Sequence, residues 1–394
     1  MNIAFLVEDP FSLGGVQRVV NNLCNELSKE NIVTLICLKP ELKINRQRYG
    51  LCEQILVSNP SELTSINQRY YFRKGLRFIN KQILGIKSVR FLEYIYLIPS
   101  EQKKLKDYFN ASDFDVVIAV QLKLSILLGS ICQDIKCKCF AWQHSSFDAY
   151  YKTPHEYYWN QNRLASKYLK KMSGCVVLSN YDVLMYKKEL DVSANKISNL
   201  VEISKAKVPA GRLKRVRTEK IILFVGRLDY KTKGLDFLLN IAEKLEKYIS
   251  YYRFLIVGDG EDKIKLEEEV KRRNLSDKVN ICEATNNVKK FYEEADLLIS
   301  TSRWEGFGLT LVEAMMFGVP FVSFDNSGPR DILDDSEAGI LIKLYDTEKF
   351  AETIAYVLQN EDLYLKMSIA AFERADDFLP NVISGEWLKM FREK

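Results

Sequence analysis

Two glutamates, Glu305 and Glu313, stand eight positions apart and are separated by a segment with two glycines. An apolar strand is expected directly before this segment, and a helix directly after Gly308. Backbone N–H groups at the start of a helix attract anions and offer a seat for a diphosphate. A carboxylate one turn into the helix, at Glu313, can accept hydrogen bonds from ribose hydroxyls, and Glu305 in the loop is placed to meet a sugar. The pattern predicts a sugar-nucleotide site.

Two glutamates at this spacing also fit the solvated face of an ordinary helix. The strand, the Gly-x-Gly loop and the helix around them favour the binding site, because the motif then stands in the structural context that its chemistry needs. The further residues expected to line this site are Phe307, Gly308, Leu309 and Thr310.

Two cations, Arg227 and Lys233, follow another apolar stretch, the strand expected at 221–225. Ligands of parallel sheets bind at the carboxyl ends of the strands, so both side chains are expected at the edge of the sheet where a ligand would bind. Positive charge there would offset the charge of a diphosphate. The alternative is that both residues are surface cations that only balance charge.

The segment from Glu305 to Ala314 resembles the paired-glutamate motif of retaining GT-B glycosyltransferases, especially family 4. The resemblance extends over nearly the whole chain. Residues 14–18 are similar to that family's N-terminal glycine loop, 224–234 to its diphosphate-binding arginine and lysine element, and 257–260 to its strand-end loop. The last helix, with Trp387 and Phe391, resembles the C-terminal segment that crosses back onto the N-terminal domain.

The resemblance implies roles for the matching residues on the donor side. Arg227 and Lys233 would neutralise the diphosphate and its departing charge, so that no metal is required. Gly14 and Gly15 would bring backbone N–H groups to the phosphate, and Gly226 would lie at the same site. The donor base is expected to be uridine.

The resemblance also implies how the reaction proceeds. His144 would contact the donor sugar, and Ser179 and Asn180 would line the acceptor side. Retention would follow from front-side substitution through an oxocarbenium-like state, with the departing phosphate taking the acceptor proton. Glu305 would orient the hydroxyls of the donor sugar and not act as a covalent nucleophile, so the paired-carboxylate scheme of hydrolases does not apply.

The elements that position these residues form two alternating series. Apolar strands bounded by turns and interleaved with helical patterns predict an α/β fold of two tandem Rossmann-like domains, facing across a donor cleft. The strands expected in the first series are 3–7, 32–38, 116–120, 139–142 and 175–178, and in the second 221–225, 254–257, 279–281, 297–300, 321–324 and 340–342. The domains expected are an acceptor-binding domain at 1–203, a basic linker at 204–220, a sugar-nucleotide domain at 221–378 and a returning helix at 379–394.

Composition fits two folded domains. The 394 residues are 47% hydrophobic and 28% charged, and two histidines leave little for a zinc site. The eight cysteines are scattered and are expected to be reduced structural thiols. No apolar run has the length of a membrane span or of a secretory signal, so we expect a cytoplasmic protein.

Charge is unevenly distributed. Residues 1–220 hold 34 Lys and Arg against 20 Asp and Glu, whereas 221–394 hold 23 against 32. The segment 69–106 contains ten basic residues interleaved with aromatics, a composition that suits a surface helix on an anionic membrane, at the inner face of the cell membrane. The alternative is an ordinary amphipathic helix with a solvated basic face. Nucleic-acid binding is disfavoured because the sequence has no groove-reading motif.

These features together predict a glycosyltransferase that moves a sugar from a nucleotide-diphosphate sugar to a glycan or lipid-linked saccharide. A bacterial polysaccharide pathway, for capsule or lipopolysaccharide, is what the resemblance implies. The alternatives are a nucleotide-sugar epimerase on the same fold and a non-catalytic subunit that binds a sugar nucleotide.

Overall fold

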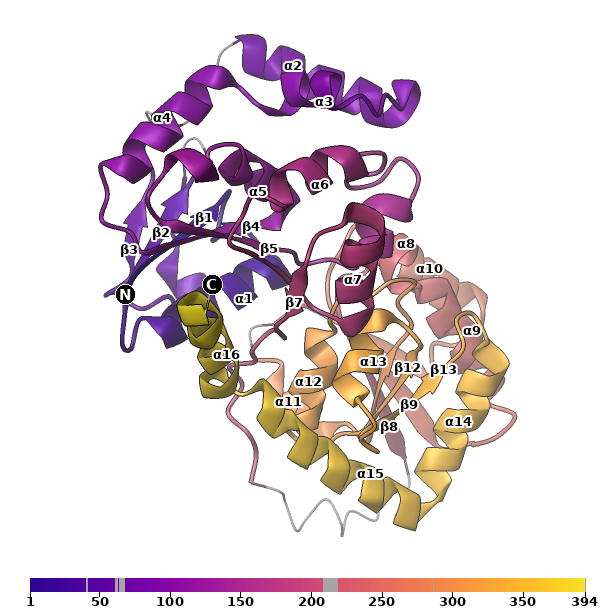
Figure 1. The fold of residues 1–394 in the computed structure, drawn as a ribbon. Helices are drawn as coiled ribbons and strands as arrows, with labels where there is room; N and C mark the ends of the chain where they lie inside the picture. Colours follow the sequence, from indigo (N-terminus) through magenta and orange to yellow (C-terminus); the bar gives the residue numbers. More distant parts are fainter. Residues whose placement is uncertain (40–41, 61–62, 64–67, 208–218, 286, 394) are drawn as a thin grey trace. The chain divides into compact units, whose positions relative to one another are not determined.

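The computed structural model describes residues 1–394 except 40–41, 61–62, 64–67, 208–218, 286 and 394, with the backbone alone at 68–71 (Figure 1). The chain forms two compact units, the first made of Met1–Leu200 with Pro380–Lys394 and the second of Val201–Leu379. Most of the linker predicted at 204–220 lies outside the described residues. No helix of the described residues is long and apolar enough to cross a membrane.

The first unit is built on a parallel sheet of seven strands in the order β3-β2-β1-β4-β5-β6-β7. Ile3 of the first strand pairs with Val33 on one side and Val116 on the other. The strands are β1 (Asn2–Val7), β2 (Ile32–Cys37), β3 (Leu56–Ser58), β4 (Val116–Val120), β5 (Lys138–Trp142), β6 (Gly174–Val177) and β7 (Ala194–Lys196). All five strands expected from the sequence are present. The two edge strands β3 and β7 were not expected, because each is three residues long and lacks a continuous apolar run.

Helices cover both faces of this sheet, as expected for a doubly wound fold. The helices of the first unit are α1 (Gly15–Leu27), η1 (Arg46–Tyr49), α2 (Gln68–Ile79), η3 (Asn80–Leu84), α3 (Val89–Tyr96), α4 (Pro99–Asn110), α5 (Gln121–Gly129), η4 (Cys132–Asp134), η5 (Asp148–Lys152), α6 (Asn162–Leu169), α7 (Asn180–Met185), η6 (Tyr186–Leu190) and α16 (Pro380–Glu393). In Figure 1, α5 and α6 lie over one face of the sheet, and α1 and α16 over the other.

The C-terminal helix α16 packs on the first unit, although it is the last element of the chain. Its Trp387 lies 5.0 Å from the ring of Trp142, and its Phe391 lies 5.1 Å from Phe140. Lys138 donates a hydrogen bond to the carbonyl of Phe391 at 2.9 Å. Side chains of successive strand residues point to opposite faces, so β5 presents its aromatics to α16 and its smaller residues to α5.

The second unit is built on a parallel sheet of six strands in the order β10-β9-β8-β11-β12-β13. The strands are β8 (Lys220–Val225), β9 (Tyr252–Val257), β10 (Val279–Cys282), β11 (Leu297–Ser300), β12 (Phe321–Phe324) and β13 (Gly339–Ile342). All six were expected from the sequence, within two residues at each end. Their apolar runs are continuous because helices cover both faces.

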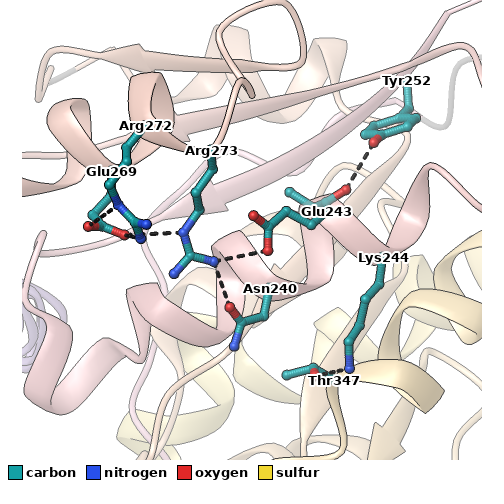
Figure 2. Close-up of polar contacts among 9 residues, drawn as sticks. Asn240, Glu243, Lys244, Tyr252, Glu269, Arg272, Arg273 and Thr347 are labelled. Atoms are coloured by element: carbon teal, nitrogen blue, oxygen red, sulfur yellow. Dashed lines mark hydrogen bonds and ion pairs between the residues drawn. The ribbon is translucent and has the colours of Figure 1, made fainter.

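The helices of the second unit are α8 (Tyr230–Lys233), α9 (Leu235–Leu245), α10 (Lys263–Arg272), α11 (Lys289–Glu294), α12 (Leu309–Met315), α13 (Ser327–Leu333), α14 (Thr347–Gln359), α15 (Glu361–Arg374) and η7 (Ala375–Phe378). Figure 2 shows how α9 and α10 are joined. Arg273, at the end of α10, donates hydrogen bonds to Asn240 and Glu243 of α9 at 2.7 and 3.1 Å, and to Glu269 at 3.1 Å.

Candidate functional site

The second unit brings Lys233 and Glu305 together, although they lie 72 positions apart. The Nζ atom of Lys233 is 2.6 Å from Oε2 of Glu305, and the hydroxyl of Ser302 donates to the same oxygen at 3.2 Å. Both charged side chains are largely buried. Lys233 ends α8, which follows β8, and Glu305 follows β11, so the pair stands at the carboxyl edge of two neighbouring strands.

Hydrogen bonds fix the loop of Glu305 against the segment that carries Lys233. The hydroxyl of Thr301 donates to the carbonyl of Lys233 at 2.9 Å, and the backbone N–H of Arg303 donates to Thr232 at 2.9 Å. Gly234, with φ of 63°, permits this approach, because a Cβ there would lie 2.2 Å from the carbonyl oxygen of Thr301. Two residues that precede Glu305, Thr301 and Arg303, therefore fix the loop to the segment of Lys233.

The guanidinium of Arg303 adds a second clamp. It donates to the carbonyl of Tyr230 at 2.6 Å and makes a bidentate pair with Asp236 at 3.0 and 2.7 Å. It also lies 4.4 Å from the centre of the Phe237 ring. A bidentate arginine–carboxylate pair fixes orientation as well as distance, so Arg303 ties the loop to both α8 and α9.

Glu313 lies in α12, and its side chain is 1% exposed. The hydroxyl of Tyr292, from α11, donates to its Oε2 atom at 2.6 Å. A buried carboxylate is costly unless hydrogen bonds compensate it, so Tyr292 helps to hold this charge in place. The sequence offered no signal for Tyr292, because its partner is 21 residues away on a different element.

The turn before α12 has the backbone that the sequence predicted. Gly308, with φ of 108°, precedes the first helical residue Leu309, and no side chain caps the helix. The neighbouring Thr310 lies within the first turn. Phe307 is buried and packs edge-on against Phe378 at 5.7 Å. Its ring therefore belongs to the core of the unit, and only its backbone remains available for the donor contact that we predicted.

Arg227 is exposed and pairs with a neighbour. Its side chain is 62% exposed, and Nη2 is 2.8 Å from Oδ2 of Asp229. Gly226, just before it, lies next to Lys233, since a Cβ at Gly226 would be 3.8 Å from the lysine side chain. Arg227 thus starts from the predicted strand end, with a guanidinium that is partly open to solvent.

Asp229 organises the turn between these cations. Its Oδ1 accepts hydrogen bonds from the backbone N–H groups of Lys231 and Thr232 at 2.9 and 3.1 Å, which caps α8. Burial alone would raise the pKa of Asp229, but the hydrogen bonds from Thr232 and the charge of Arg227 lower it overall. The residue is therefore held as a carboxylate.

Carboxylate oxygens of Asp229, Glu261 and Asp262 lie within 4.8 Å of one another. The oxygens of Asp229 already serve Arg227 and two backbone N–H groups, and Asp262 accepts from the N–H of Tyr230 at 2.8 Å. The cluster thus has cationic and N–H partners within the protein. Independence of metal remains a prediction.

In the first unit, Gly14 and Gly15 stand at the start of α1, as predicted. The N–H of Gly14 donates to the hydroxyl of Tyr49 at 2.9 Å, and that hydroxyl in turn donates to the carbonyl of Ser12 at 3.0 Å. One backbone N–H group of the glycine loop, that of Gly14, is therefore already hydrogen-bonded to a residue of η1. Tyr49 was not identified from the sequence.

His144 follows β5 and packs on Trp142, with ring centres 4.2 Å apart. Its Nε2 atom is buried and has no hydrogen-bond partner among the described residues. Burial lowers the pKa of His144 to about 3. The imidazole is neutral at physiological pH, so it can serve a ligand as a neutral hydrogen-bonding group and not as a cation.

Ser179 caps a helix. It is fully buried; its hydroxyl donates to Oδ2 of Asp182 at 2.7 Å and accepts from the N–H of Asp182 at 3.1 Å. Oδ1 of Asp182 accepts from the N–H of Phe147 at 2.7 Å. The hydroxyl of Ser179 is thus occupied by the start of α7, whereas its neighbour Asn180 is exposed. Of the two predicted acceptor residues, Ser179 is buried and Asn180 is exposed.

Part of the basic segment predicted at 69–106 faces the protein. Arg73 donates to the carbonyl of Leu97 at 2.7 Å and lies 4.8 Å from the centre of the Tyr94 ring. Arg77 lies 5.5 Å from the centre of the Tyr96 ring. These two arginines hold α2 against α3, and other residues of the segment form its outer surface.

Comparisons with known proteins match this chain to glycosyltransferases. Residues 211–374 match the family model described as Glycosyl transferases group 1. An uncharacterized glycosyltransferase of Haemophilus influenzae is 26% identical over 98% of both chains. The poly(ribitol-phosphate) alpha-N-acetylglucosaminyltransferase of Staphylococcus aureus is 31% identical over 56% of this chain and 44% of that protein, so the match spans less than half of that relative.

Solved structures establish the fold. Sucrose-phosphate synthase from Thermosynechococcus elongatus matches with a TM-score of 0.76 at 18% identity, over 100% of this chain and 99% of that one. HepE from Anabaena, in complex with UDP, matches with a TM-score of 0.75 at 16% identity over 100% of both chains. The chain has the GT-B architecture of two Rossmann-like domains, and the family model with the relatives supports a glycosyltransferase.

Proposed function

We propose that this chain is a retaining glycosyltransferase that uses a nucleotide-diphosphate sugar, with UDP as the nucleotide, and a glycan or lipid-linked saccharide as the acceptor. One observation carries the proposal. Lys233 and Glu305 meet at the carboxyl edge of β8 and β11, in a loop fixed by Arg303 and Thr301. A cation and a carboxylate at that edge match the needs of a diphosphate and of a sugar hydroxyl.

The role of each residue follows from its chemistry. Lys233 and Arg227 offset the charge of the diphosphate, and this charge grows as the bond to the sugar breaks. Glu313 accepts hydrogen bonds from ribose hydroxyls, and Glu305 orients hydroxyls of the transferred sugar. The acceptor hydroxyl attacks from the face that the diphosphate leaves, and the departing phosphate oxygen takes its proton. The anomeric configuration is thereby retained without a covalent enzyme intermediate.

Support for UDP comes from solved structures of similar fold. The structures of HepE and of Staphylococcus aureus TarM include complexes with UDP. The first experiment is therefore thermal stabilisation by UDP, GDP and ADP. We expect UDP to raise the melting temperature, and the rise to vanish in Glu313→Ala. Stabilisation by none of the three would count against a sugar-nucleotide site.

Independence of metal is a separate part of the proposal. Two cations take the place that a divalent ion holds in other transferases. The same stabilisation and the transfer reaction are expected to persist in excess EDTA. Loss of both in EDTA, with recovery on Mg²⁺ or Mn²⁺, would assign a metal to the site and direct attention to Asp229 and its acidic neighbours.

We also propose that α2 and η3 rest on an anionic membrane that holds the acceptor. Phe72, Phe78, Ile83 and Leu84 are more than half exposed on these two helices. Lys74, Lys87 and Arg90 are exposed on the same segment. Exposed apolar side chains flanked by cations are typical of a helix at a lipid surface.

A non-catalytic sugar-nucleotide subunit is the alternative, and an epimerase on the same fold is a further one. Both would bind UDP at the same residues. Release of free UDP from a UDP-sugar in the presence of acceptor distinguishes transfer from both, because binding and epimerisation leave the sugar–phosphate bond intact.

A further inference from the structure

A cavity of about 100 Å³ opens in the first unit at the carboxyl ends of β1 and β4, beside α1. Its apolar wall comes from valines of three elements, Val7, Val20 and Val120, and its polar residues include Glu8, Gln17 and Gln121. The volume exceeds what one water needs. Folds of this kind bind ligands at the carboxyl ends of their parallel strands. The residues that line this cavity have no role in the donor site proposed above, although some of them lie next to the glycine loop.

The two carboxylates that line this cavity are neutralised by lysines of the protein. Glu8 pairs with Lys123, and Asp9 pairs with Lys39 at 2.7 Å while also accepting from the N–H of Phe11 at 2.9 Å. Both carboxylates that line the cavity therefore have cationic partners within the protein. No lysine or arginine of the described residues lines the cavity, so a ligand with its own negative charge would find no cationic partner there, whereas a neutral ligand with hydroxyl donors would meet oxygen acceptors.

Two side-chain amides at this cavity, those of Gln17 and Gln121, lack partners within the described part of the chain. Neither makes a hydrogen bond to another described residue, although both line the cavity. An amide offers one acceptor oxygen and two N–H donors, so it can satisfy a hydroxyl group in both directions.

Gln121 has a second unusual property. It follows β4 directly and has φ of 69°, in the left-handed region that side chains other than glycine rarely adopt. Non-glycine residues held there cost stability and cluster at functional sites. Gln121 is thus both a residue with a left-handed backbone and one of the two whose side-chain amides have no partner among the described residues.

We propose that this cavity binds a neutral, hydroxyl-bearing ring of the acceptor saccharide, with Gln121 as its principal hydrogen-bonding residue. The valines would cover the apolar face of the ring, and Gln121 and Gln17 would pair with its hydroxyls. This inference rests on the proposed transferase function and names the class of acceptor and the residues that select it.

The test uses Gln121→Gly, because glycine removes the amide and also relieves the backbone. Asn274→Gly is the matched control, since Asn274 has φ of 57° and lies in the second unit. Binding is measured by saturation-transfer NMR with the methyl glycosides of glucose, galactose and N-acetylglucosamine, and with methyl glucuronide as the anionic counterpart. We expect at least one neutral glycoside to bind the wild type.

We expect Gln121→Gly to weaken that binding at least fivefold, with a melting temperature equal to or above that of the wild type. Asn274→Gly should bind as the wild type does. The proposal is overturned if no neutral glycoside binds, if Gln121→Gly binds as well as the wild type, or if the glucuronide binds as tightly as the neutral glycosides.

UDP stabilisation, measured on the same samples, separates this inference from the proposed function. If UDP stabilises the wild type while Gln121→Gly leaves glycoside binding unchanged, the cavity assignment fails and the donor site stands. If UDP stabilises no variant while Gln121→Gly abolishes glycoside binding, the transferase proposal fails and the cavity stands as a saccharide site.

Discussion

Lys233 and Glu305 neutralise each other in the absence of a ligand, with 2.6 Å between Nζ and Oε2. A diphosphate that binds here must share the lysine with Glu305 or take it over. We therefore expect the two residues to have opposite effects on nucleotide affinity, and we expect the loss of either to lower turnover.

Lys233→Met should weaken UDP binding about 10- to 100-fold, because a charge-assisted hydrogen bond is lost and Glu305 is left without its cation. Glu305→Gln should bind UDP as well as the wild type or better, since the lysine is released, while transfer falls. Calorimetric titration with UDP and a transfer assay check both. Equal loss of UDP affinity in the two variants would contradict these roles.

Glu313→Ala should abolish UDP stabilisation and also lower the stability of the free protein by about 1–3 kcal/mol, because the Tyr292 hydroxyl loses its buried acceptor. Tyr292→Phe is the control. It removes the same hydrogen bond but keeps the carboxylate, so it should lower the melting temperature and retain most UDP affinity. Loss of UDP affinity in both variants alike would indicate a structural and not a ligand-binding role for Glu313.

His144 should make the fold sensitive to mild acid. Its folded pKa of about 3 lies below the ordinary value of 6.5, so below pH 6.5 only the unfolded chain takes up this proton. Protonation of His144 in the unfolded chain therefore leaves the free energy of unfolding unchanged above pH 6.5. As the pH falls from 6.5 toward 3, it lowers that free energy by up to about 1.4 kcal/mol per pH unit. The free energy of unfolding of His144→Gln should fall less steeply between pH 6.5 and 4.5. If the free energy of unfolding falls equally with pH in the wild type and in His144→Gln, this prediction is wrong.

Trp387→Ala should destabilise the first unit by about 3–5 kcal/mol, since this fully buried ring packs on Trp142 and Phe391. Val382→Ala, at a more exposed position of the same helix, should change stability by less than 1 kcal/mol. Urea unfolding followed by tryptophan fluorescence provides the comparison. Similar midpoints for the two variants would show that α16 contributes little to this unit.

Phe78→Asp combined with Ile83→Asp should reduce sedimentation with vesicles of phosphatidylcholine and phosphatidylglycerol at least tenfold, because two exposed apolar groups become anionic. Ile264→Asp is the control, as Ile264 is equally exposed but lies in α10 of the second unit. Equal loss in the control, or no sedimentation of the wild type, would argue against the membrane surface.

Much of the fold could be predicted from the sequence, because buried parallel strands are continuous apolar runs such as those of β4 and β11. The edge strands β3 and β7 were not predicted, since each has only three residues, none of them fully buried, and carries no continuous apolar run. The motif of Glu305 and Glu313 could be read from the sequence, because its spacing is local. Lys233 was predicted as a site residue, but its pairing with Glu305 was not, and Tyr292 was not identified, because these contacts form only once the chain has folded. The backbone angle of Gln121 has no signature in its residue type.

The return of residues 380–394 to the first unit has a consequence for how this protein is made. The ring of Trp142 is covered by Trp387, so the surface under α16 stays bare while more than 240 intervening residues are still being translated. The first unit, whose sheet is translated before that of the second, is thus completed only after the second unit has been translated. A nascent chain stalled before α16 would expose this aromatic face to chaperones, and the emergence of α16 would be the event that covers it.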